Sequence, residues 1–269
     1  MFDFHLHTHV SFDGRDTAAN MAKAALRAGL REICFTDHMD YDPLDPNHKL
    51  HFDLADYEKE YDTLEVPGLI IRRGFEFGML PDNREQFQKD LKLRDWDFVI
   101  GSVHFVDNLD VYYPEYWEGR TYEAAILRGF EDILTCVRNH DGFNVLGHLT
   151  YLGKCDANPR KTPILYQDYR EVTDAVMKLL VEKGIGMEFN TSGMDRCGTC
   201  LPGSEYLRRF KELGGEIVTI GSDAHHANRV GQYCREAEEI VRDIFGYVCT
   251  FAHGKPQFHR QKKERNYQK

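Results

Sequence analysis

The feature that most constrains this chain is an alternation of short apolar segments with longer segments of helical character. Seven runs rich in β-branched and aromatic residues are typical of strands, and they cover residues 2–4, 32–36, 69–73, 98–101, 143–146, 186–189 and 216–220. Helical patterns lie between them, several ending at glycine, at residues 17–28, 54–63, 86–93, 121–139, 168–182 and 204–213. This order predicts an α/β fold with a parallel sheet, and a closed barrel is the natural closure of such a sheet.

The length of 269 residues fits one large barrel or two small domains. No linker rich in proline, glycine or serine divides the chain, so we expect one domain over residues 1–269. The sequence contains no run of about 18 apolar residues, so we expect no membrane span. The N-terminus lacks a basic segment followed by an apolar one, so no signal peptide is expected and the cytoplasm is the expected location.

The charge balance argues against a nucleic-acid partner. The net charge is −10, and the basic run at residues 260–265 lies at the very end of the chain, whereas nucleic-acid binders usually carry a basic stripe. An excess of carboxylates together with 13 histidines favours metal binding instead. The seven cysteines are scattered and suggest reduced thiols. Cys197 and Cys200 have the spacing of a metal or redox pair, but a plain loop is the favoured interpretation.

Histidine, aspartate or glutamate follows nearly every predicted strand. In a barrel the carboxyl ends of the strands converge on one face, where active sites are built. His5 and His7 are two residues apart on a strand and therefore point the same way, as do Asp223 and His225. Imidazole and carboxylate together suit zinc, iron or manganese. The number of ligands exceeds the three that one catalytic zinc takes, so a cluster of two or three divalent ions is expected.

These motifs, taken in order, resemble the motif set of the PHP phosphoesterase family. The resemblance extends from residue 5 to residue 225, and it rests on His5-x-His7, Thr36-Asp37-His38, Glu76, His104, Gly147-His148 and Asp223-Ala224-His225. Residues 188–193 and 101–104 are further similar to the histidinol-phosphate phosphatase branch. The resemblance implies a distorted seven-stranded (β/α)7 barrel of the TIM-like kind, in one PHP domain.

The resemblance also implies which residues hold each ion. The implied sets are His5, His7, Glu76 and Asp223 for a first ion, Glu76, His104 and His148 for a second, and Asp13, His38 and His225 for a third. Many relatives carry histidine at the position of Asp13. An oxygen ligand there weakens the preference of that site for soft metals.

The expected chemistry follows from such a cluster. Two ions lower the pKa of a shared water, and the bridging hydroxide attacks phosphorus while the ions hold the phosphate oxygens. No serine or cysteine nucleophile is needed. Asp37, Asp223 and His225 are candidate proton donors to the leaving alkoxide, and the sequence does not choose among them.

Substrate-binding candidates lie in the loops after the strands. Arginine matches phosphate bidentately, and Arg160, Arg196 and Arg229 follow the fifth, sixth and seventh strands. Tyr116 and Trp117 belong to an aromatic segment after His104. That segment either closes over the substrate and stacks on an imidazole ring or packs an insertion against the barrel.

The resemblance implies hydrolysis of L-histidinol phosphate to L-histidinol and phosphate in histidine biosynthesis, with a small phosphate monoester as the partner. Two alternatives stay open. Another PHP phosphoesterase would act on nucleotides or short oligonucleotides, which the acidic composition disfavours. A non-catalytic metal-binding module would be expected to have a degenerate site, whereas each expected ligand position here carries a competent residue.

Overall fold

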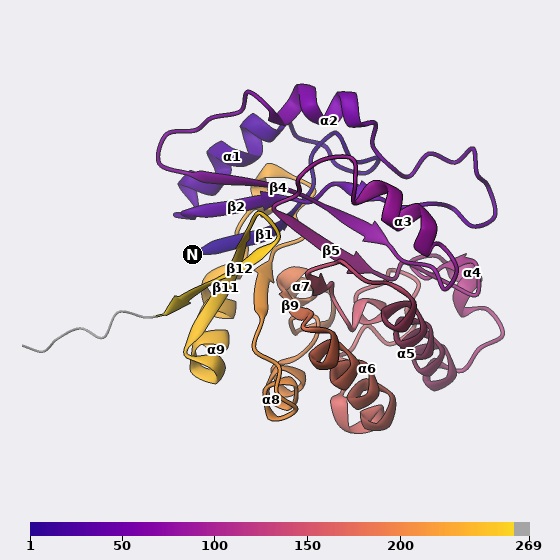
Figure 1. The fold of residues 1–269 in the computed structure, drawn as a ribbon. Coiled ribbons are helices and arrows are strands. Elements are labelled where there is room, and N and C mark those ends of the chain that lie inside the picture. Colours follow the sequence, from indigo (N-terminus) through magenta and orange to yellow (C-terminus); the bar gives the residue numbers. More distant parts are fainter. Residues whose placement is uncertain (261–269) are drawn as a thin grey trace, which may run out of the picture.

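The computed structural model describes residues 1–260, and its centre is a sheet of parallel strands that curves into a nearly closed barrel (Figure 1). The strands pair in the order β1, β2, β4, β5, β8, β9, β10, and each neighbouring pair is parallel. Their bounds are Phe2–Leu6, Glu32–Phe35, Ile70–Gly78, Phe98–Ser102, Val145–Leu146, Gly186–Asn190 and Val218–Gly221. The predicted α/β barrel is therefore confirmed.

Helices surround the strands (Figure 1). Their order gives the strand–helix alternation that the sequence predicts, and the buried apolar side chains form one large core between the layers. The bounds are α1 Ala18–Arg27, α2 Leu54–Tyr61, α3 Arg84–Asp90, α4 Pro114–Trp117, α5 Tyr122–Asn139, α6 Arg170–Lys183, α7 Met194–Cys197, α8 Ser204–Glu212 and α9 Cys234–Phe245. None of the helices formed by residues 1–260 combines the length and the apolar character needed to cross a bilayer.

Local chemistry sets several helix ends. The side chains of Thr17 and Thr121 accept hydrogen bonds from backbone N–H groups of α1 and α5, and such caps satisfy donors that have no partner within the helix. Gly184 ends α6 with a φ of 68°, a left-handed conformation that glycine adopts without a steric penalty. These ends agree with the predicted ranges because caps are local signals.

The C-terminal part contains elements that the sequence did not predict. Helix α9 is followed by an antiparallel hairpin of β11 (Tyr247–Ala252) and β12 (Lys255–Arg260). Phe251 of the hairpin packs on Phe98 of β5 with the ring centroids 5.0 Å apart. The hairpin thus contacts the amino end of β5, away from the converging carboxyl ends. Short strands add β3 (His38–Met39) beside β4 and the pair β6 (Phe105–Val106) and β7 (Leu109–Asp110).

Candidate metal centre

The carboxyl ends of the barrel strands bring the predicted ligands into three overlapping sets. In the first set, His5 lies near the end of β1 and His7 directly follows it. The Nε2 atoms of His5 and His7 lie 3.2 and 3.5 Å from Oε2 of Glu76 on β4. They lie 3.8 and 3.6 Å from Oδ1 of Asp223, which follows β10. Four donors from three elements therefore face one small space.

The second set uses the other oxygen of the same glutamate. Oε1 of Glu76 lies 2.8 Å from Nε2 of His148 and 3.4 Å from Nε2 of His104. The two ring nitrogens are 3.5 Å apart. Ser102, at the end of β5, donates a hydrogen bond of 2.6 Å to the same Oε1. Glu76 thus stands between the two sets, in the place of a bridging carboxylate.

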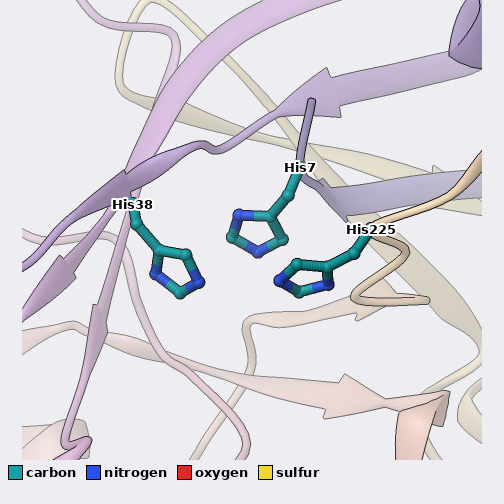
Figure 2. Close-up of side chains that lie close together, drawn as sticks. All are labelled: His7, His38 and His225. Atoms are coloured by element: carbon teal, nitrogen blue, oxygen red, sulfur yellow. The ribbon is translucent and has the colours of Figure 1, made fainter. Parts of the chain in front are cut away.

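The third set lies beside the first. His7, His38 and His225 offer ring nitrogens within 4.8 Å of one another, and Figure 2 shows the three rings gathered around one space. The ring of His7 stacks on those of His38 and His225 at centroid distances of 4.3 and 4.2 Å. Oδ2 of Asp13 lies 3.0 Å from Nε2 of His225 and 3.6 Å from Nε2 of His38. The structure thus brings all nine predicted ligands together, although their role as ligands stays a prediction.

Several of the nitrogen and oxygen atoms that could bind a metal are buried and have no hydrogen-bond partner. They are Nε2 of His5, Nε2 of His7, Nδ1 of His38, Oε2 of Glu76 and Oδ1 of Asp13. Buried polar atoms are nearly always paired, because an unsatisfied one loses its hydration without compensation. Atoms of this kind that face one another fit a site for cations.

The charges in the cluster suit a cation as well. Burial alone would raise the pKa of Glu76, but His5, His104 and His38 lower that pKa well below its usual value. Burial likewise opposes ionisation of Asp223, but Lys154 and His5 hold its pKa well below the usual range. Both carboxylates are therefore negative at neutral pH. Negative oxygens beside imidazoles are the ligands that zinc, iron and manganese accept.

Hydrogen bonds on the far side of the rings orient them. Oε1 of Glu188 on β9 lies 2.6 Å from Nδ1 of His5, and Oδ2 of Asp40 lies 2.7 Å from Nδ1 of His104. A carboxylate at Nδ1 places the proton there and leaves Nε2 free to bind a metal. The other oxygen of Glu188 accepts the backbone N–H of His148 at 2.8 Å, so one carboxylate contacts the ring of His5 and the backbone of His148. Sequence reasoning did not single out this role for Glu188.

The ring of His7 is fixed through a hydroxyl group. Ser11 Oγ donates to Asp37 at 2.9 Å, so toward Nδ1 of His7, 3.2 Å away, it acts as an acceptor. Burial lowers the pKa of His7 well below its usual value. His7 is therefore neutral with its proton on Nδ1, and Nε2 is free. Asp37 is fully buried, also accepts from Thr8 and Tyr61, and is not on the cavity wall. Its predicted role as proton donor finds no support in this geometry.

A cavity of about 670 Å³ opens over the cluster. Of the predicted arginines, Arg196 and Arg229 line it, the first paired with Asp156 and the second 2.6 Å from Asp195. Arg160 does not line it: this side chain pairs with Glu123 and lies in a separate groove between α5 and α6. The structure therefore corrects the prediction that places Arg160 beside the substrate.

The aromatic prediction needs a similar correction. Tyr116 is fully buried and donates to the carbonyl of Ala125, and Trp117 donates to the carbonyl of Val111 at 2.9 Å. Both rings pack the insertion against the rest of the protein, and Tyr112 and Tyr113 line the cavity instead. The packing alternative for Tyr116 and Trp117 is thus the one the structure favours.

Lys154 is a cavity residue that sequence reasoning missed. It follows the short 3-10 helix Tyr151–Gly153, and its Nζ contacts Oδ2 of Asp223 and lies 2.8 Å from Oγ of Ser192. No motif surrounds it, so only the fold reveals its place. Cys197 and Cys200 are buried free thiols, and burial raises the pKa of Cys200 to about 12. A thiol of such high pKa is a poor nucleophile and metal ligand.

The family of this fold and centre is shown by comparison with known proteins. The PHP domain family matches residues 3–192. The chain therefore belongs to the PHP family, and the resemblance predicted from the motifs is confirmed.

Several individual members of the PHP family are similar to this chain over most of its length. The chain is 29% identical to the histidinol-phosphatase of Lactococcus lactis, with 93% of this chain and 94% of that protein covered. It is 31% identical to a probable histidinol-phosphatase of Deinococcus radiodurans, over 95% and 98% of the two chains. A crystal structure of the Lactococcus lactis enzyme, complexed with zinc, L-histidinol and phosphate, superposes with a TM-score of 0.85 over 95% of this chain and 98% of that chain, at 27% identity.

Proposed function

We propose that this protein hydrolyses L-histidinol phosphate to L-histidinol and inorganic phosphate, a reaction of histidine biosynthesis. The observation that carries the proposal is the cluster of buried, unpartnered donor atoms at the strand ends, beneath a cavity with cationic side chains on its wall. The similarity to a structure that holds zinc, L-histidinol and phosphate supports the choice of substrate.

The three donor sets would hold up to three divalent ions. His5, His7, Glu76 and Asp223 would hold the first, Glu76, His104 and His148 the second, and Asp13, His38 and His225 the third. When bound, such ions supply a water molecule of lowered pKa as the nucleophile and positive charge for the phosphate oxygens. Zinc, manganese and iron all suit these ligands.

The cavity wall supplies the cations for the phosphoryl group. Lys154 contacts Asp223 inside the cavity, and Arg196 and Arg229 lie nearer the surface with half-exposed side chains. Ion pairs of exposed side chains contribute roughly 0–1 kcal/mol. A phosphate dianion can therefore draw Arg196 and Arg229 from Asp156 and Asp195, and bidentate bonds to its oxygens would hold it in place.

The proton balance of the reaction points to Asp223. Its Oδ1 faces the donors of the first set, and its Oδ2 contacts Lys154. We propose that Asp223 relays the proton of the attacking water to the leaving oxygen as the P–O bond breaks. Because Lys154 and His5 keep this carboxylate ionised, its protonated form would exist only during the transfer and would readily give the proton to the strongly basic leaving alkoxide. His225, which also lines the cavity, is the alternative carrier.

The proposal is tested by phosphate release from L-histidinol phosphate, with the metal content of the protein quantified and with a nucleoside monophosphate and a short oligonucleotide as rival substrates. Release from histidinol phosphate alone, lost in Glu76→Ala, is the expected result. Arg160→Ala is the matched control for Arg196→Ala: the first is expected to keep the wild-type KM, and the second to raise it about tenfold or more.

Two outcomes would overturn parts of the proposal. Release only from the nucleotide substrates would leave a metal-dependent phosphoesterase but refute the substrate. Full metal loading with no turnover of any of the three phosphoesters would favour the non-catalytic alternative.

A further inference from the structure

A buried carboxylate lies at the junction between β1 and β10, the two ends of the strand order, which we call the seam of the barrel. Asp3 of β1 is fully buried, and its Oδ1 accepts the backbone N–H of Ser222 at 2.8 Å. Its Oδ2 accepts the hydroxyl of Ser222 at 2.5 Å and the backbone N–H of Gly231 at 2.9 Å. Within residues 1–260 no lysine, arginine or histidine forms an ion pair with it. Oδ1 also accepts the backbone N–H of His5 at 3.4 Å, so Asp3 links its own strand beside His5 to the loop of residues 222–231.

The seam is the junction between β1 and β10, where the ladder of paired strands is interrupted. β1 and β10 are the two ends of the strand order, and no ladder joins them in the part of the chain that the structure describes. What joins them is an isolated bridge between Leu6 and Ala224, with hydrogen bonds from His7 N to Ala224 O of 3.0 Å and from Asp223 N to His5 O of 2.8 Å. Backbone ladder bonds are therefore few at this junction, and side-chain hydrogen bonds such as those of Asp3 add to them.

The metal centre straddles this seam. His5 and His7 come from the β1 side, and Asp223 and His225 come from the loop after β10. Asp223 has a φ of 55°, a left-handed conformation that is uncommon for residues other than glycine and persists only where neighbours enforce it. Ser222, directly before it, is the residue that Asp3 binds twice.

We infer that Asp3 is a positioning residue that fixes the 222–231 loop across the seam, so that Asp223 and His225 meet His5 and His7. The inference rests on the proposed metal-dependent function. It assigns Asp3 no contact with metal or substrate. Its specific consequence is that losing the carboxylate weakens the ions held by Asp223 and His225, but not the ion held by Glu76, His104 and His148.

The test compares Asp3→Asn with a matched variant. The amide keeps one oxygen but turns an NH2 group toward the N–H of Gly231, so that bond is lost. Asp90→Asn is the control, because Asp90 is likewise buried and is bound by the uncharged donors Tyr41 and Gln86 at 3.0 and 2.9 Å, far from the seam. Metal content after gel filtration, chelator competition and the visible spectrum of cobalt-loaded protein are measured, with circular dichroism to check folding.

The expected result is a selective loss. Asp3→Asn should lower the metal stoichiometry, weaken the affinity of the ions at the seam about 10–100-fold and leave one ion of wild-type affinity. Asp90→Asn should bind metal as the wild type does. Ser222→Ala, which removes only the hydroxyl bond, should show the same selective loss to a smaller extent, and it decides the question if Asp3→Asn does not fold.

Three results would overturn the inference: unchanged metal binding in Asp3→Asn, an equal loss of all ions, or the same loss in Asp90→Asn. Each is separable from a failure of the proposed function. A wild-type protein that binds metal but does not release phosphate from histidinol phosphate refutes the substrate and leaves the metal measurements valid.

Discussion

At the scale of single residues, the proposed metal centre depends on carboxylates that hydrogen-bond to Nδ1 of the ligand histidines, on the side of each ring away from the metal site. Glu188 binds Nδ1 of His5 and the N–H of His148 with its two oxygens. The Glu188→Gln side chain has only one acceptor oxygen, so it can accept from His5 or from His148 but not from both. With the amide oxygen on the N–H of His148, the NH2 group faces Nδ1 of His5 and moves the ring proton to Nε2. Metal affinity should fall about 10–100-fold.

Chelator competition measures this effect. Glu212→Gln is the control, because that side chain is exposed on α8. Equal metal affinity in Glu188→Gln and the wild type would show that Glu188 does not orient the ring of His5.

Asp90 gives a prediction for the dependence of stability on pH. Burial raises the pKa of Asp90 from 3.8 to about 6, although Tyr41 and Gln86 partly oppose this. The unfolded chain therefore releases the proton more readily than the folded one. The wild type should lose up to about 3 kcal/mol of stability from this group as the pH rises from about 4 through about 6.

Asparagine at position 90 does not titrate, so the stability of Asp90→Asn relative to the wild type should increase over the same range. Urea unfolding of both proteins at several pH values measures the difference, in which the shared titrations cancel. A difference that is constant with pH, or that falls as the pH rises, contradicts the prediction.

For some residues of the site, the position at the metal centre or cavity could be predicted from the sequence, and for others it could not. His5 and His7 could be predicted, because the two-residue spacing on a strand decides which way both rings point. Lys154 could not, because its place depends on a turn of 3-10 helix that carries no motif. Arg160 and Tyr116 both follow a strand end, which makes the first a candidate for binding the substrate and leaves the second open between stacking on the substrate and packing the insertion. Sequence distance from a strand does not say which way a long loop turns. Their partners, Glu123 and the carbonyl of Ala125, are visible only in the fold.

At the scale of elements, the last residue of β10 sets how closely the strand approaches its neighbours. A Cβ at Gly221 would lie 2.3 Å from Oε1 of Glu188 and 2.4 Å from Cβ of His5. Gly221→Ala should therefore displace His5, lower the free energy of unfolding by about 1–3 kcal/mol and weaken metal binding.

Gly184→Ala provides the contrast. No atom lies within 4 Å of the added methyl group, but the φ of 68° makes the residue strained, so stability should fall by about 1–2 kcal/mol while metal affinity stays at the wild-type value. Denaturant unfolding and metal titration of both variants separate the two effects. Unchanged metal affinity in Gly221→Ala would show that the strands move apart and leave the ring of His5 in place.

The elements themselves were predictable where local signals bound them. Threonine caps and a terminal glycine mark α5 and α6, and their observed ends lie within about two residues of the predicted ones, the usual spread between ways of defining an end. Helix α9 was missed although its apolar residues recur with helical spacing. It begins without a side-chain cap at Tyr233, whose φ of 59° is not a sequence signal. The hairpin after it follows no strand–helix alternation, so the pattern that revealed the barrel gave no reason to expect it.

At the scale of the whole molecule, the proposed ions are part of what holds the barrel together. The donors come from both sides of the seam and from most strands of the sheet, and several buried donor atoms have no partner within residues 1–260. A ligand that binds only the folded state stabilises it by about 3–4 kcal/mol at 100 to 1,000 times its Kd. Removing the metal should therefore lower the melting temperature by about 10 °C, at roughly 2–4 °C per kcal/mol for a domain of this size.

Calorimetry with and without a strong chelator, followed by addition of zinc or manganese, measures the loss and its recovery. Glu76→Ala is the matched control, because it removes the carboxylate shared by two of the sets and should make the melting temperature much less sensitive to the chelator, with only the third set left to respond. A wild-type melting temperature that does not change on chelation would mean that the protein alone closes the seam. An equal decrease in both proteins would place the stabilising ions elsewhere than at Glu76. Recovery in the wild type alone is the outcome that ties the stability of the barrel to the same carboxylate that the proposed chemistry requires.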